Sequence, residues 1–147
     1  MKALIDTNVI IDVLQQREPW FKEGSAIFLA IAGRQVAGHI TARQVLDLHF
    51  FSRKQFRGQN DVDARAREVI AKLLGLFEVI DTLAVDCRTA MGIDNNDYED
   101  AVMIASAQRS GMDCIVTRDP DHFRASPIAV YSPGSFIQHC LSKDSGL

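Results

Sequence analysis

The chain has 147 residues, a formal net charge of −3 and 47% hydrophobic residues, which is typical of one folded domain and not of a disordered or fibrous chain. No apolar run approaches the roughly 20 residues of a membrane-spanning helix, and Asp6 interrupts any N-terminal signal peptide. We therefore expect a cytoplasmic protein that does not bind membranes, with one domain over residues 1–141 and a polar tail over residues 142–147.

Short strand-like runs alternate with helical patterns along the chain. Strands are expected at residues 2–6, 36–40, 77–80, 114–117 and 129–131. Helices are expected after Asp6, from Pro19 to near Gly33, after Thr41 (with Val45, Leu46, Leu48 and Phe51 as apolar positions), from Asp61 or Asp63 to near Gly75, over 82–92, from Asp97 to Gly111, and from Pro133. This alternation predicts right-handed βαβ crossovers. The expected fold is therefore an α/β sandwich of three layers, with a mainly parallel sheet of four to five strands between helices.

Charge is unevenly distributed between two segments. Residues 34–72 contain eight basic and four acidic residues, whereas residues 78–121 contain three basic and ten acidic ones. A solvated helix face explains any single charge. Together, the two segments suggest an anionic polymer held beside a cation site.

Five aspartates are expected near one edge of the sheet, where the carboxyl ends of parallel strands gather functional groups. Asp6 and Asp119 follow the first and fourth strands, Asp47 lies in the helix after the second strand, and Asp97 and Asp100 begin the helix before the fourth. Converging carboxylates repel one another unless a cation binds, and Mg²⁺ or Mn²⁺ prefers such oxygen ligands. The cysteines and histidines lack the spacing of a zinc site. The pattern therefore favours phosphodiester hydrolysis at a Mg²⁺ or Mn²⁺ site.

Each of these aspartates also has a purely structural explanation. Four of them suit helix caps, first-turn charges or turn residues: Asp6, Asp97, Asp100 and Asp119. Asp47 has no helix end nearby, but it can form an ion pair with Arg43 one turn earlier. The residues alone leave both explanations open.

Four blocks of sequence, in order and at family spacing, resemble the PIN-domain ribonucleases. They are Leu4–Asp12, Gly38–Ala42 with Asp47 beyond it, Asp97–Ala107 and Cys114–Asp119. With the segments between them they cover most of the chain, from residue 2 to about residue 131. The resemblance implies an α/β/α domain that binds Mg²⁺ or Mn²⁺ through acidic residues and cuts RNA.

The resemblance also implies a role for individual residues. The acidic catalytic and metal-binding set would be Asp6, Asp47, Asp100 and Asp119, with Asp97 as an auxiliary ligand, Asn8 and Thr117 as supporting residues, and Asp121 as the alternative to Asp119. The family most often has glutamate at the second acidic position. Because Asp47 is one methylene shorter, it can act directly or through water, and the number of ions stays open.

Single-domain bacterial PIN proteins of this size resemble the toxins of toxin–antitoxin pairs. This resemblance implies a homodimer with an RNA substrate and a small antitoxin protein as partner. The alternative is a non-catalytic PIN-fold module that binds RNA or protein, which the short Asp47 side chain favours. A receiver-like phosphotransfer domain is disfavoured because the expected strand-end lysine is missing. Nucleotide hydrolysis is disfavoured because no phosphate-binding GxxxxGK[ST] loop is present.

Overall fold

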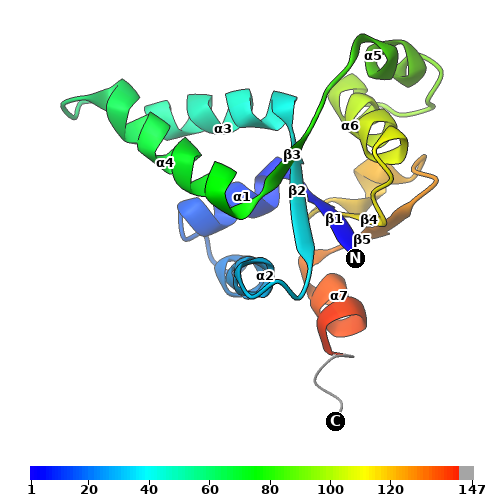
Figure 1. Ribbon diagram of the computed structural model, residues 1–147, viewed down its shortest axis with the longest axis horizontal. Coiled ribbons are helices and arrows are strands. Elements are labelled where there is room, and N and C mark those ends of the chain that lie inside the picture. The colour runs from blue at the N-terminus through cyan, green and yellow to red at the C-terminus, as the bar shows by residue number, and fades with distance from the viewer. Residues whose placement is uncertain (143–147) are drawn as a thin grey trace.

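Five short strands form one central sheet in the order β3-β2-β1-β4-β5 (Figure 1). The computed structural model describes residues 1–142, so the predicted tail, apart from Ser142, lies outside the described residues. The strands are β1 (Lys2–Ile5), β2 (Ala37–Thr41), β3 (Glu78–Ile80), β4 (Cys114–Val116) and β5 (Ala129–Tyr131). The helices are α1 (Thr7–Leu14), α2 (Phe21–Ala32), α3 (Ala42–Gln55), α4 (Val62–Leu76), α5 (Ala84–Ala90), α6 (Tyr98–Arg109), η1 (Pro120–Phe123), α7 (Pro133–Phe136) and η2 (Ile137–Leu141).

Every strand pair in the sheet is parallel, and β1 lies in the middle. Leu4 pairs with His39 of β2 on one side and with Ile115 of β4 on the other. The carboxyl ends of β1, β2 and β4 therefore lie at one edge of the sheet. This result confirms the predicted fold class, with five strands and no antiparallel member among the described residues.

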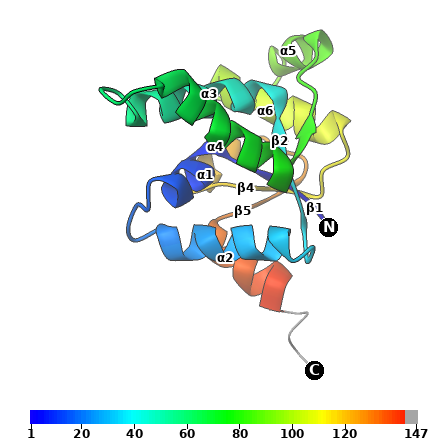
Figure 2. The same cartoon turned by 60° about the vertical axis from the view of Figure 1, so that its left-hand side comes forward.

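The sheet separates two hydrophobic cores because successive side chains of a strand point to opposite faces. On one face, Ile5 of β1 packs with residues of α1, α2, α3, α4 and α7, including Ile10 and Phe136. On the other face, Leu4 and Ile115 pack against α6 and Phe123. These cores produce the three layers that Figures 1 and 2 show from two directions.

Helices α3 and α4 pack side by side and extend away from the sheet (Figures 1 and 2). Thr41 caps the N-terminus of α3 with a reciprocal capping box. Its hydroxyl accepts from the backbone amide of Gln44, and the side-chain oxygen of Gln44 accepts from the backbone amide of Thr41. Of the apolar positions predicted for α3, Leu48 is buried, but Leu46 is 69% exposed and Phe51 is 36% exposed. Leu46 and Phe51, two of the expected apolar positions, therefore lie outside the hydrophobic core, because only part of the helix has the sheet beneath it.

Within the described part of the chain, no helix is both long and apolar enough to cross a membrane.

Candidate active site

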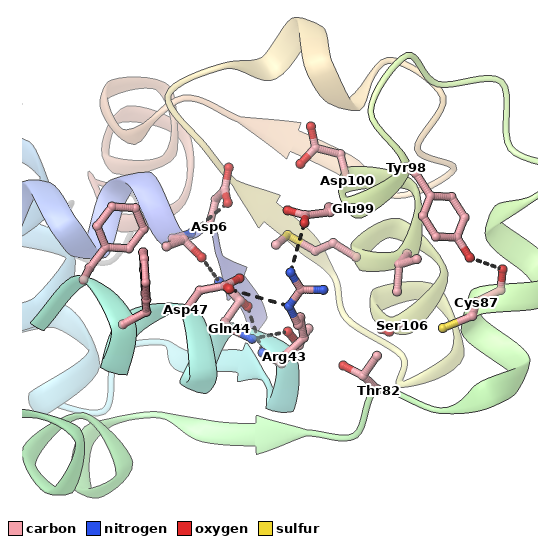
Figure 3. A pocket seen from close by; sticks show the side chains of 16 residues that line it. Asp6, Arg43, Gln44, Asp47, Thr82, Cys87, Tyr98, Glu99, Asp100 and Ser106 are labelled. Carbon is pink, nitrogen blue, oxygen red and sulfur yellow. Dashed lines mark hydrogen bonds and ion pairs between the residues drawn. The ribbon is translucent and has the colours of Figure 1, made fainter. Parts of the chain in front are cut away.

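A cavity of about 450 Å³ opens between α3 and α6, above the ends of β1 and β2 (Figure 3). Three of the predicted acidic residues line it, namely Asp6, Asp47 and Asp100. Each comes from a different element, so the fold brings distant parts of the sequence together. The side chains of Asp97 and Asp119 are not part of this lining.

Asp6 lies where β1 gives way to α1, and its side chain is fixed by two donors. Its Oδ1 accepts from the Thr7 amide at 2.7 Å, which makes Asp6 the N-cap of α1. Its Oδ2 accepts from the Thr117 hydroxyl, also at 2.7 Å. Burial nevertheless raises the pKa of the Asp6 carboxyl above its ordinary value. The capping role and a place in an acidic site are therefore compatible.

Thr117 and Asn8 connect the loop after β4 to the end of β1. The Thr117 hydroxyl that donates to Asp6 also accepts from the Asp119 amide at 3.1 Å. Asn8 donates from Nδ2 to Asp119 Oδ2 at 3.2 Å and accepts from the Arg118 amide at 3.3 Å. This network orients Asp119 relative to Asp6, and Asp119 in turn helps to raise the pKa of Asp6.

The loop after β4 is also anchored from behind by Arg118. Its Nε lies 2.8 Å from Oδ2 of the buried Asp12 side chain on α1. Its guanidinium carbon lies 4.0 Å from the centroid of the Trp20 ring. Arg118 therefore extends away from the cavity. Its positive charge is paired with Asp12 and does not neutralise the acidic residues of the cavity.

Asp100 lies in the first turn of α6, beside Asp97. Asp97 caps this helix by accepting from the Asp100 amide at 3.2 Å. The pKa of Asp100 is raised to about 7, first by burial and then by the negative charges of Asp97 and Asp6. Within residues 1–142, no lysine or arginine pairs with Asp6, Asp97, Asp100 or Asp119, and His122 Nδ1 lies 3.9 Å from Asp100 Oδ2.

Asp47 lines the cavity from α3 but has an internal cation beside it. Its Oδ1 lies 3.6 Å from Nε of Arg43, which is the ion pair that the sequence left open. The same guanidinium crosses the cavity and donates to Glu99 on α6 at 2.9 Å (Figure 3). Asp47 thus differs from Asp6, Asp100 and Asp119 in that an arginine already pairs with its carboxylate.

Asp121 lies in η1 and is directed elsewhere. Its side chain is 80% exposed and pairs with Arg124 at 3.1 Å. Since Asp119 is the residue coupled to Asp6, the geometry favours Asp119 over Asp121 as the acidic residue after β4.

Gln44, Glu99 and His122 were missed as site residues by the sequence analysis. Gln44 is 1% exposed, and its Nε2 donates to the Ile5 carbonyl at 2.8 Å, which anchors α3 to the end of β1. The spacing Thr-x-x-Gln is a recognisable capping box and could have identified Gln44. Neither Glu99 nor His122 belongs to a comparable motif.

The donor set suits a hard divalent cation that retains part of its water shell. Among the described residues, no three His, Cys, Asp or Glu side chains gather closely enough to ligate one ion together. Mg²⁺, however, is usually held by one or two carboxylates and several waters. Asp6 and Asp100 supply such carboxylates. Asp6 is buried and Asp100 is half-buried, the charge of Asp6 raises the pKa of Asp100, and no arginine or lysine of the described residues pairs with either.

The comparisons with known proteins agree on the fold. FitAB bound to an IR36 DNA fragment is 22% identical, with a TM-score of 0.68 over 89% of this chain and 94% of that one. VapBC2 from Rickettsia felis, bound to a promoter DNA fragment, is 13% identical, with a TM-score of 0.64 over 90% and 98%. A toxin–antitoxin complex from Klebsiella pneumoniae is 21% identical, with a TM-score of 0.63 over 89% and 97%. No curated protein matches the sequence.

At these identities the solved structures establish the fold alone, whereas a sequence model of the PIN domain matches residues 2–121, most of the chain. The chain therefore belongs to the PIN-domain family.

Proposed function

We propose that this protein is an endoribonuclease that depends on Mg²⁺ or Mn²⁺. The observation that carries the proposal is the pair Asp6 and Asp100. Asp6 is buried and Asp100 is half-buried, the pKa of each carboxyl is raised, and neither has an arginine or lysine partner among residues 1–142. Asp6, Asp100 and Asp119 would hold the cation, with Asp97 as an auxiliary ligand. Asp47 would act directly or through water once it is released from Arg43.

In this proposal, the protein positions the reacting groups and supplies negative charge. Thr7 and Thr117 fix both oxygens of Asp6, and Asn8 fixes Asp119. Preorganised ligands of this kind lower the cost of reaching the productive geometry. The bound cation would offset the charge that develops on the phosphate and lower the pKa of water. Arg43, the basic residue lining the cavity, would contact a phosphate of the substrate.

The test is cleavage of a mixed single-stranded and structured RNA pool by purified protein. We expect cleavage with Mg²⁺ or Mn²⁺, no cleavage in EDTA, and at least a 100-fold lower rate for Asp6→Asn. Glu68→Gln is the matched control, because it removes one negative charge from an exposed position of α4 outside the cavity. Equal activity of Asp6→Asn and Glu68→Gln would contradict the proposal.

A second pair of variants tests which aspartate after β4 belongs to the acidic site. Asp119→Asn is expected to lose most of the activity, whereas Asp121→Asn is expected to retain it. The reverse result would show that η1 rearranges to bring Asp121 into the site. Absence of both cleavage and Mn²⁺ binding in the wild-type protein would favour the non-catalytic module instead.

We also propose that the protein is the toxin of a bacterial toxin–antitoxin pair, acting in the cytoplasm as a homodimer. Support comes from the structural neighbours, among which the protein from Klebsiella pneumoniae is described as a toxin–antitoxin complex. A small antitoxin would then cover the acidic cavity. Light scattering of the purified chain would test the dimer, and a monomer at micromolar concentration would contradict it.

A further inference from the structure

Phe50 is an exposed aromatic residue on α3 that separates two hollows of the surface. Its side chain lines the acidic cavity, although the residue is 57% exposed. It also lines a neighbouring hollow of about 360 Å³, whose other lining residues are Arg53, Lys54, Arg57, Gly58 and Val62. Phe50 is the one residue that both linings share in the described part of the chain. A path from the carboxylates to the basic hollow therefore passes over this ring.

The basic residues beyond Phe50 are largely uncompensated. Lys54 Nζ lies 5.0 Å from the centroid of the Phe50 ring. Across residues 1–142, neither Lys54 nor Arg57 forms an ion pair with an acidic residue, whereas Arg53 pairs with Asp63. The hollow thus offers positive charge directly beside an aromatic face, which matches the phosphates and bases of a nucleic acid.

The spacing along α3 gives the path a direction. Arg43, Phe50 and Arg57 are separated by seven residues each, which is close to two helical turns, so they follow one side of α3 and the turn after it. At about 1.5 Å per residue, the path from Arg43 to Arg57 is roughly 20 Å long. That length accommodates a few nucleotides of an extended strand.

We propose that single-stranded RNA binds along this side of α3, with one base stacked on Phe50 and the adjoining phosphates on Lys54 and Arg57. The strand continues past Arg43 to the carboxylates, so this inference rests on the proposed nuclease function and names its substrate class. A single strand is required because a base in a duplex cannot present its face to a protein ring. A nucleic acid fits better than a protein helix because three of the six residues that line the second hollow are cations.

The first experiment measures the binding of a fluorescent single-stranded RNA octanucleotide pool by anisotropy, in an Asp6→Asn background that prevents cleavage. We expect Phe50→Ala to weaken binding about tenfold, in line with base–aromatic stacking, and Phe50→Tyr to retain it. Leu46→Ala is the matched control, because it removes a neighbouring exposed apolar side chain that lines neither hollow. A duplex of the same length should show no dependence on Phe50.

The second measurement is the salt dependence of the same binding. Lys54→Ala and Arg57→Ala should each reduce the slope of log K against log salt concentration by about 0.7, as expected for one lost phosphate contact on a single strand. Lys22→Ala, an exposed position of α2 on the other side of the molecule, should leave the slope unchanged. Equal slopes for all the variants would overturn the proposal.

Failure of this proposal and failure of the nuclease function give different results. If the wild-type protein cleaves RNA and Phe50→Ala cleaves it with the same KM, the nuclease stands and the α3 path is overturned. If the wild-type protein cuts nothing but binds single strands through Phe50, the path stands and the nuclease function fails. If Phe50→Ala and Leu46→Ala bind RNA equally, the exposed ring belongs to a protein interface, and the proposal is overturned.

Discussion

Helix α6 takes part in two acidic environments of opposite character, one at each end. At its C-terminal end, Ser106 and Arg109 hold Asp86 of α5, which is 2% exposed. At its N-terminal end, Asp100 lies beside Asp97 and Asp6 and has no arginine or lysine partner within the described residues. Both environments are built on the same rigid helix, so the difference between them comes from their neighbours.

Asp86 is fully compensated inside the chain. Arg109 Nε donates to its Oδ1 at 2.7 Å, and its Oδ2 accepts from Ser106 at 2.9 Å and from the Leu83 amide at 2.9 Å. Arg109 lowers the pKa of Asp86, whereas burial and like charges raise the pKa of Asp100 to about 7. Asp86, which is paired with Arg109, supports the fold. Asp100, which has no arginine or lysine partner among the described residues, is suited to bind a cation from solution.

The largest expected effect on stability is that of Asp86→Ala. Removing this side chain leaves Arg109 and Ser106 without their partner, and breaking a buried ion pair costs about 3 kcal/mol of unfolding free energy. Urea unfolding followed by circular dichroism measures this loss. Asp100→Asn, treated in the same way, should unfold no earlier than the wild-type protein, because it removes a repelling charge. An equal loss in both variants would erase the distinction between the two environments.

A pH series distinguishes the two environments further. Because the folded pKa of Asp100 lies near 7 and its ordinary value is 3.8, the folded state holds more protons between these pH values. The unfolding free energy should therefore fall as pH rises from about 4 to 7, and level off above that. The pKa of Asp86 is lowered in the folded state, so its pH dependence has the opposite sign. The contribution of Asp86 to the unfolding free energy is lost only as pH falls below about 4.

The measurement is urea unfolding in EDTA at pH 5, 6, 7 and 8, for the wild-type protein and Asp100→Asn. The wild-type protein should lose stability relative to the variant across this series. Added Mn²⁺ should stabilise the wild-type protein more at pH 8 than at pH 5, because the cation competes with protons. A constant difference between the two proteins at all four pH values would contradict the raised pKa.

The smallest expected effect is that of Asp63→Asn on α4. Asp63 also has cationic partners, Arg53 and Arg67, but both of these side chains are exposed to solvent. Exposed ion pairs contribute little to stability, so the urea midpoint should not change measurably. A loss as large as that of Asp86→Ala would mean that pairing matters even without burial.

The fold was predictable from the sequence because strand-like runs and helical patterns alternate in a way that few architectures allow. The edge that gathers Asp6 and Asp100 followed from the same topology. The exposure of Leu46 and Phe50 was not predictable, because it depends on how far α3 extends beyond the sheet. The pairing of Arg43 with Glu99 was not predictable either, since it joins two helices whose separation no local pattern sets.

The central position of β1 affects when the site can form during synthesis. β1 precedes both of its neighbours in the chain, and the Thr117 hydroxyl that fixes Asp6 comes 111 residues after it. A ribosome therefore delivers Asp6 long before the strand and loop that order it. Under the proposed function, an unfinished chain would be harmless to the messenger RNA from which it is being translated, and cleavage would begin only after β4 has joined the sheet.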